Sequence, residues 1–272
     1  MRVEDFTMII DTHTHIFPDS LAPRAMTSLS DHSGCYKPHT KGTVQSLLSS
    51  MDEAGITTSW IANIATKPSQ TSAIIAWSRE IKSGRIFPLA SVYPHSGTWE
   101  NDVEDVAAAG IRGIKLHPLY QNFYADDPEL NDFFSLLEKK GIFVLLHAGY
   151  DIGYGKADNA HPVRIRRLLD KHPDLTLIAA HLGGWDSWID VESCLAGTNC
   201  YFDTSFSHEV SKPVFESIIA KHGEDRLVFA SDSPWLEQKH QVSFINSLDI
   251  SSEAKEKIFS KNALELQSRQ IL

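Results

Sequence analysis

Two histidines one residue apart, His13 and His15, follow a short apolar run at residues 8–10. In an extended strand, residues i and i+2 lie about 6.6 Å apart and point to the same face. Two neutral imidazole nitrogens held in this way could bind one metal ion. The pair alone is a weak signal, because two unrelated histidines would give the same pattern. Further ligands must therefore come from the rest of the sequence.

Three later segments each place one ligand-type side chain after an apolar run, at a turn marked by Gly or Pro. These segments are residues 142–149 with His147, residues 175–184 with His181, and residues 227–234 with Asp232. Continuous apolar runs of this length are typical of strands buried on both faces, as in a parallel sheet covered by helices. Any one of the three could be a buried, hydrogen-bonded polar residue. Their repetition instead indicates one shared site.

Apolar runs and helical patterns alternate along the whole chain. Strands are predicted near residues 8–14, 58–64, 86–93, 111–117, 142–147, 175–180, 200–204 and 227–231. Helices are predicted between them, for example at 43–54, 69–83, 127–140, 162–171, 212–222 and 251–267. Strict alternation over about 250 residues favours a single-domain α/β fold, a (β/α)8 TIM barrel spanning residues 1–272. A doubly wound open sheet is the alternative.

A barrel would also explain how such distant residues meet. Catalytic groups of these barrels come from the C-terminal ends of the strands. His13 and His15 end the first predicted strand, whereas His147, His181 and Asp232 end the fifth, sixth and eighth. Closure of the barrel would bring all five around one axial pocket.

Composition excludes several other classes of protein. The net charge is −10 and 22% of residues are charged. No apolar stretch approaches the roughly 18 residues of a membrane span, and no cluster of basic residues predicts nucleic-acid binding. The first residues include Glu4 and Asp5 where an export signal would be basic, so we expect a cytoplasmic protein that acts on a small molecule. The three cysteines lack a C-x-x-C pair and are expected to be ordinary thiols.

These features together resemble the amidohydrolase superfamily. Within it they are most similar to the amidohydrolase 2 branch, which includes aminocarboxymuconate-semialdehyde decarboxylase and related lactonases and hydrolases. The motifs are Asp11-Thr-His-Thr-His15, Gly113-Ile-Lys-Leu-His-Pro118, His147-Ala-Gly149, His181-Leu-Gly-Gly184, Phe202-Asp-Thr-Ser205, Ser231-Asp-Ser-Pro-Trp235 and Ile258-x-x-x-Asn262-Ala. The residues that the resemblance assigns to a divalent metal, usually zinc, are His13, His15, His147 and Asp232. It also implies that His181 binds a second metal or orients the reacting water, and that the chain self-associates.

The fourth predicted strand leaves the number of metals open. In binuclear members of the superfamily a lysine at this position, carboxylated by carbon dioxide, bridges two metals, and Lys115 could play that part. The alternative, which we favour, is a lysine in the barrel interior that pairs with Asp11 or Asp203. One zinc ion is then favoured over two, with another divalent metal as an open alternative. Lys115 and His117 share a face, so His117 is a further candidate for a second metal or for substrate.

A metal ion with an open coordination position lowers the pKa of bound water to about 7 and so supplies hydroxide at neutral pH. Asp232 beside it could accept the proton of that water and return it to a leaving group. His181 could donate a hydrogen bond to a carbonyl oxygen as charge develops there. The sequence therefore predicts hydrolysis of a small cyclic ester, lactone or amide.

Non-oxidative decarboxylation of an unsaturated or aromatic carboxylate is the alternative reaction. It requires a cation for the substrate carboxylate, and Arg24 is the candidate in the loop after the first strand, although a solvent-exposed arginine would give the same pattern. Hydrolysis is favoured because the strand-end loops show no other clear candidate. A barrel that only binds a ligand is a third interpretation, which no residue specifically supports.

Aromatic residues just past the strand ends suggest walls for a cyclic or conjugated substrate, although packing under loops would also explain them. They are Phe17, Tyr120, Tyr150, Trp185 and Trp235. Residues 17–42 form a long loop that we interpret as a lid, and residues 154–159 are a second candidate. Within the first, His32, Cys35 and His39 give a weaker zinc prediction, because a fourth ligand is missing.

Overall fold

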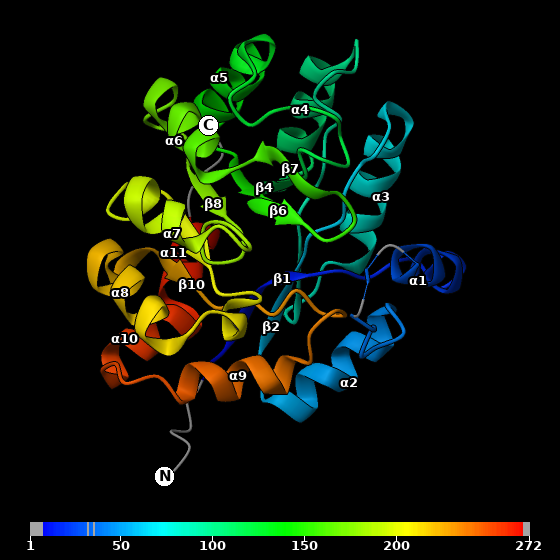
Figure 1. Cartoon of the computed structure of the whole chain (residues 1–272). Coiled ribbons are helices and arrows are strands. Elements are labelled where there is room, and N and C mark those ends of the chain that lie inside the picture. Colours follow the sequence, from blue (N-terminus) through cyan, green and yellow to red (C-terminus); the bar gives the residue numbers. More distant parts are fainter. Residues whose placement is uncertain (1–7, 32, 35, 269–272) are drawn as a thin grey trace.

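Eight parallel strands form the centre of the molecule within residues 8–31, 33–34 and 36–268, which the computed structural model describes. Their bounds are β1 (Ile10–Thr14), β2 (Thr58–Ile61), β3 (Ile86–Pro88), β4 (Gly113–Leu116), β5 (Phe143–Leu146), β8 (Leu177–Ala179), β9 (Tyr201–Asp203) and β10 (Leu227–Val228). Helices lie around the outside of these strands (Figure 1).

Backbone pairing closes the strands into a barrel. One sheet has the order β1-β2-β3 and the other the order β10-β9-β8-β5-β4, with every pairing parallel. A parallel bridge between Ala90 and Ile114 joins the two sheets after β3, and a bridge between Thr14 and Ser233 joins them at β1. The predicted (β/α)8 TIM barrel is therefore confirmed.

The helices follow local signals in the sequence. Their bounds are α1 (Ala22–Ser30), α2 (Val44–Ala54), α3 (Thr71–Ile81), α4 (Trp99–Ala108), α5 (Asn131–Lys140), α6 (Pro162–Lys171), α7 (Trp188–Asp190), α8 (Lys212–His222), α9 (Gln238–Asn246), α10 (Ser252–Glu256) and α11 (Asn262–Ser268). Thr43 and Ser46 cap the start of α2 reciprocally, and Gly55 ends it in a left-handed conformation. None of the helices in the described ranges is long and apolar enough to cross a membrane.

Two apolar clusters stabilise the barrel. One includes Trp60 and Phe143, whose ring centroids lie 5.2 Å apart, and fills the barrel interior. The other lies between the strands and the helices. Alternation along β4 separates these environments, because Ile114 and Leu116 join the outer cluster whereas Lys115 does not. Lys115 therefore faces the interior of the barrel.

Two segments differ from the sequence-based expectation. The predicted lid at residues 17–42 contains helix α1, whose apolar residues Ala22 and Met26 are buried. The second lid candidate forms an antiparallel hairpin with the residues before it, made of β6 (Gly149–Asp151) and β7 (Gly155–Ala160). The polar sequence of β7 gave no strand pattern, since most of its residues are exposed. Whether either segment moves stays a prediction.

Gly149 connects the barrel to this hairpin, and its position excludes a side chain. It has a φ of +87°, and a Cβ atom there would lie 2.2 Å from the Trp185 backbone nitrogen. We expect Gly149→Ala to lower the free energy of unfolding by about 3 kcal/mol, through backbone strain and steric overlap. Urea denaturation would measure the change. Gly84→Ala is the control, because a Cβ at Gly84 meets no atom within 4 Å. Equal stability of the two variants would contradict the expected overlap.

Candidate active site

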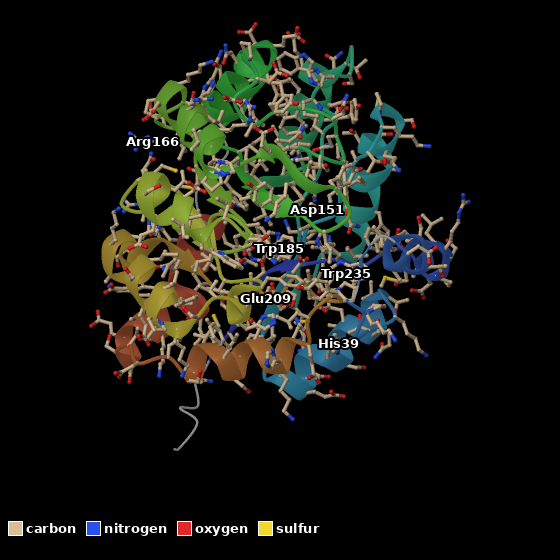
Figure 2. All side chains as sticks on the ribbon, in the orientation of Figure 1. His39, Asp151, Arg166, Trp185, Glu209 and Trp235 are labelled. Carbon is tan, nitrogen blue, oxygen red and sulfur yellow. The ribbon has the colours of Figure 1, made fainter. Side chains whose placement is uncertain are left out.

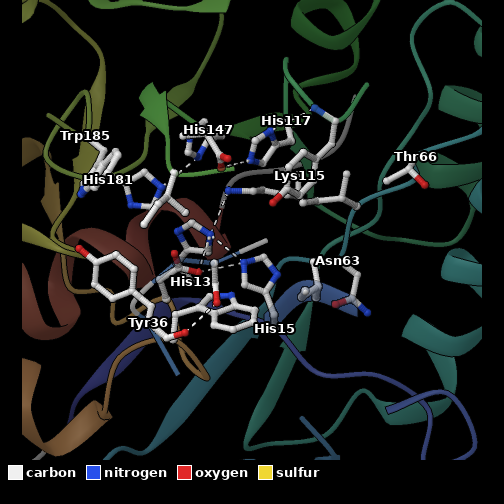
Figure 3. A pocket seen from close by; sticks show the side chains of 18 of the residues that line it. His13, His15, Tyr36, Asn63, Thr66, Lys115, His117, His147, His181 and Trp185 are labelled. Carbon is white, nitrogen blue, oxygen red and sulfur yellow. Dashed lines mark hydrogen bonds and ion pairs between the residues drawn. The ribbon is translucent and has the colours of Figure 1, made fainter. Parts of the chain in front are cut away.

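A cavity of about 430 Å³ lies at the C-terminal ends of the barrel strands. Figure 2 shows Asp151, Trp185 and Trp235 around this region, and Figure 3 shows the cavity from close by. The residues expected from the sequence that line it are His13, His15, Phe17, Lys115, His117, Tyr120, His147, Tyr150, His181, Trp185, Asp232 and Trp235. Arg24 is not among its lining residues. Helix α1 turns Ala25, Ser28 and Leu29 toward the cavity, which leaves Arg24 exposed.

His13, His15 and Asp232 form a compact group of metal-ligand atoms. Their ligand atoms all lie within 4.8 Å of one another. The Nε2 atoms of the two histidines are 3.2 Å apart, and Asp232 Oδ1 lies 3.0 Å from His15 Nε2. Two imidazole nitrogens and one carboxylate oxygen form a donor set that divalent zinc and manganese both accept.

The environment of Asp232 supports this interpretation. Its Oδ1 atom is buried, and it has no aligned hydrogen-bond partner in the described part of the chain, although His15 is close. Burial would raise the pKa of Asp232, but the nearby His13, His15 and Lys115 lower it below its usual value. A buried, ionised oxygen without an aligned hydrogen bond is costly. A cation between the three side chains would remove that cost, so the residues present fit a divalent metal.

Asp203, at the end of β9, determines which nitrogen of His13 is free. His13 is 1% exposed and Asp203 is fully buried, and His13 Nδ1 lies 2.8 Å from Asp203 Oδ2. Because a carboxylate oxygen accepts, the proton of the imidazole is on Nδ1 and the lone pair is on Nε2. Burial, reinforced by the charge of Lys115, also lowers the pKa of His13 and keeps the ring neutral. His13 Nε2 therefore carries the lone pair that a metal ligand needs.

The same carboxylate fixes His181 through a serine. The Ser205 hydroxyl donates to Asp203 Oδ1 at 2.5 Å, so the Ser205 oxygen accepts the hydrogen bond from His181 Nδ1 at 2.8 Å. The lone pair of His181 is consequently on Nε2. In this tautomer Nε2 lacks the N–H that donation to a carbonyl oxygen requires, and burial lowers the pKa of His181 and disfavours a second proton.

His147 presents a second lone pair to His181. Its Nε2 lies 3.1 Å from the Tyr150 carbonyl oxygen, which can only accept, so the proton is on Nε2. His147 Nδ1 therefore faces His181 Nε2, 3.1 Å away, with a lone pair on each atom. A cation near these two nitrogens would relieve their repulsion. The assignment of His147 to the same ion as His13, His15 and Asp232 stays a prediction.

Lys115 makes a different contact from the expected one. Its side chain is 1% exposed, and its Nζ atom lies 2.9 Å from His13 Nε2. Asp11 instead accepts hydrogen bonds from Ser231 and Gln238, at the side of the barrel where β10 meets β1. Burial lowers the pKa of Lys115 to about 8, against the opposing effect of Asp232 and Asp203. Lys115 thus places an ammonium group among the candidate metal-ligand side chains.

His117 is stacked between Tyr120 and His147. The centroid of the His117 ring lies 3.8 Å from the Tyr120 ring centroid and 4.0 Å from the His147 ring centroid. Both neighbouring rings are nearly parallel to it. Nitrogen lone pairs lie in the ring planes, so two stacked imidazoles direct their lone pairs along separate planes. The group His117, His147 and Asp151, although compact, is thus poorly arranged to hold one ion.

Glu209 connects two aromatic side chains of the cavity wall. It accepts hydrogen bonds from the Tyr36 hydroxyl and, at 2.9 Å, from Trp185 Nε1. Tyr36 also packs edge to face on Phe206, and all three aromatic residues line the cavity. No sequence pattern indicated Glu209, because its partners are far away in the chain. Asp203 and Ser205 stood in a recognised motif, but no pattern indicated that they orient histidines.

The weaker zinc prediction cannot be followed in full, because His32 and Cys35 lie outside the described residues. The third member, His39, is exposed, and its backbone N–H donates to the Pro234 carbonyl.

Comparison with known proteins identifies the family. The family model described as Amidohydrolase, Amidohydro_2, matches residues 10–266. The chain belongs to the amidohydrolase 2 family. It is therefore an enzyme of the amidohydrolase superfamily, as the motifs indicated. A search of curated proteins finds no match to it.

Solved structures share the fold of this amidohydrolase at low sequence identity. An uncharacterized TIM-barrel protein from Bordetella bronchiseptica has a TM-score of 0.77 and 20% identity, covering 96% of this chain and 100% of that one. A 2,6-dihydroxybenzoate decarboxylase in complex with 2,6-dihydroxybenzoate has a TM-score of 0.73 and 17% identity. This match covers 97% of this chain and 100% of that one. The third structure is a dihydroxybenzoic acid decarboxylase from a Polaromonas species, with bound manganese and the inhibitor 2-nitroresorcinol. It has a TM-score of 0.73 and 15% identity, and the match covers 96% of this chain and 97% of that one.

The role of Asp203 in this amidohydrolase can be tested by Asp203→Asn. An asparagine can donate to His13 Nδ1, which moves the imidazole proton to Nε2 and removes the lone pair. We expect about 10- to 100-fold weaker binding of Zn²⁺ or Mn²⁺, measured by competition with a chromophoric chelator. Asp132→Asn, on the exposed surface of α5, is the control and should bind metal normally. Unchanged metal affinity in Asp203→Asn would refute this role.

The contacts of Glu209 can be tested by hydrogen exchange. Glu209→Gln leaves one acceptor oxygen for two donors, so either Tyr36 or Trp185 loses its partner. We expect amide exchange in residues 36–40 or around Trp185 to become about tenfold faster, because a hydrogen bond to a charged group is lost. The control is Glu80→Gln on the exposed face of α3. Exchange rates equal to those of the parent protein would show that Glu209 does not hold the cavity wall.

Proposed function

We propose that this protein is a metal-dependent decarboxylase of an aromatic or unsaturated carboxylate. The observation that carries the proposal is the position of Lys115, whose Nζ atom lies 2.9 Å from His13 Nε2. Lys115 is the one lysine or arginine among the described residues that line the cavity. An ammonium group next to the metal-ligand side chains would hold a substrate carboxylate beside the metal.

The sequence favoured hydrolysis because a cation for the carboxylate could be sought only in the loops. Lys115 lies in the barrel strand β4 instead, and its side chain extends into the cavity from the barrel interior. A carboxylate substrate carries a full negative charge that this ammonium group can pair with on binding, whereas a neutral ester or lactone does not. Decarboxylases of hydroxylated aromatic acids among the similar structures add support, although their low identity to this chain shows the fold alone.

The metal is proposed to be a single divalent ion held by His13, His15 and Asp232, with His147 as a further ligand. When bound, it would supply the positive charge that withdraws electron density from the substrate. Manganese accompanies similar structures, whereas the sequence suggested zinc. Imidazole and carboxylate donors bind both ions, so the proposal covers either.

The protein side chains would position the substrate and move one proton. Lys115 holds the carboxylate, and aromatic side chains such as Tyr36 and Phe206 enclose the ring. Asp232 accepts a proton from water or from the substrate and passes it to the carbon that bears the carboxylate. The bond to the carboxylate carbon then breaks, carbon dioxide leaves, and the electron pair returns to the conjugated system.

Release of carbon dioxide from a panel of hydroxybenzoates and unsaturated acids would test the proposal. We expect turnover after loading with Mn²⁺ or Zn²⁺. Lys115→Met should lower kcat/KM about 100-fold, because the methionine fills the same space but cannot hold a carboxylate. Metal content per chain is measured in parallel, so that loss of the metal is not mistaken for loss of substrate binding.

Lys171→Met, on the exposed surface of α6, is the matched control and should leave kcat/KM unchanged. The opposite result would be that the parent and Lys115→Met hydrolyse neutral lactones or esters at the same rate and that no acid releases carbon dioxide. This result would support the hydrolase and contradict the proposal.

A further inference from the structure

We propose that Asp151, beside His117, is the acceptor for a hydroxyl group of the substrate. The inference rests on the proposed function and specifies its substrate as a hydroxylated aromatic acid. Asp151 ends strand β6 of the hairpin that follows β5, and its side chain lines the cavity (Figure 2). No pattern in the sequence suggested a function for it.

The contacts of Asp151 leave one oxygen with acceptor capacity. Its Oδ1 atom accepts a hydrogen bond from the Gly153 backbone N–H at 2.8 Å, which closes the turn of the hairpin. Its Oδ2 atom lies 3.4 Å from His117 Nε2, which is longer than a normal hydrogen bond. The hairpin turn therefore accounts for the hydrogen bonding of Oδ1 but leaves Oδ2 without a close donor.

His117 is held so that it offers only this weak contact. Its Nδ1 atom faces the Tyr120 backbone N–H, a donor, in an equally long contact of 3.4 Å. This arrangement places the imidazole proton on Nε2, toward Asp151. Stacking on Tyr120 and His147 fixes the plane of the ring.

Asp151 consequently lacks a cationic partner. No lysine or arginine side chain in the described ranges forms an ion pair with it, and it is only 8% exposed. A nearly buried carboxylate with one strong hydrogen bond is incompletely satisfied. A hydroxyl group on a bound ligand would supply the missing donor.

The charges of the cavity also determine the orientation of the ligand. A substrate carboxylate next to Asp151 would be repelled, whereas the ammonium group of Lys115 attracts it. The carboxylate therefore lies at Lys115 and the metal-ligand side chains, and the hydroxyl group lies at Asp151.

Binding of paired ligands to the metal-loaded protein tests this site without turnover. The probes are 3- and 4-hydroxybenzoate and their methoxy counterparts, with phenol and anisole as a pair that lacks the carboxylate. Isothermal titration calorimetry would measure each Kd. In the parent protein we expect at least one hydroxyl compound to bind about tenfold more tightly than its methyl ether, because only the hydroxyl donates.

Asp151→Asn should reduce this preference to less than about threefold, since an amide accepts a weaker hydrogen bond than a carboxylate. The control is Asp158→Asn, in the same hairpin but exposed, where the preference should persist. Circular dichroism and metal content confirm that each variant is folded and loaded.

Equal binding of hydroxyl and methoxy ligands to the parent protein, for phenol and anisole as well, would overturn the inference. So would a full preference in Asp151→Asn. Carbon dioxide release with no effect of Asp151 on the preference would leave the proposed reaction intact and refute this site. A preference that depends on Asp151 without release of carbon dioxide from any acid would support the site and refute the reaction.

Discussion

The carboxylate of Asp203 is the constraint on which the rest of the site depends. It is fully buried, accepts from His13 Nδ1 through one oxygen, and accepts from Ser205 through the other. Through that serine it also orients His181. Both imidazoles must then present Nε2 lone pairs to the cavity. Without this carboxylate the histidines could exchange tautomers, and their Nε2 lone pairs would not be held ready for a metal ion.

Barrel closure converts these local contacts into a site. Residues from β1, β9 and the segment after β10 meet only because the bridge between Thr14 and Ser233 completes the circle of strands. The polar side chains of the site lie next to the apolar cluster of the barrel interior, which includes Trp60 and Phe143. A shift of the strands relative to one another would disrupt the packing of that cluster. Rigid strands therefore position the ligand atoms, and the loops are free to determine what the cavity accepts.

The sequence predicted the strands and the polar residues that follow them well, for a physical reason. A strand buried on both faces must be apolar throughout, so a polar residue such as His147 or Asp232 marks the point where the strand leaves the core. The partner of Lys115 could not be predicted, because several acids lie in the barrel interior and only the side-chain directions select among them. The β6–β7 hairpin was missed because its outer strand is exposed and polar, and Glu209 was missed because its partners are distant in sequence.

The distribution of charge explains why such a cavity would select its substrate. Burial lowers the pKa of His13, His117, His147 and His181, so these rings stay neutral. The lysine and carboxylate groups among the described lining residues are those of Lys115, Asp151 and Asp232. Asp232 would be neutralised by the metal, which leaves one positive and one negative group in a space with aromatic walls. In a medium of low polarity, each unpaired charge is costly until an opposite or hydrogen-bonding group reaches it. A ligand with an anionic end and a donor end satisfies both charges at once, whereas a ligand with only one of these groups leaves the other charge without a partner.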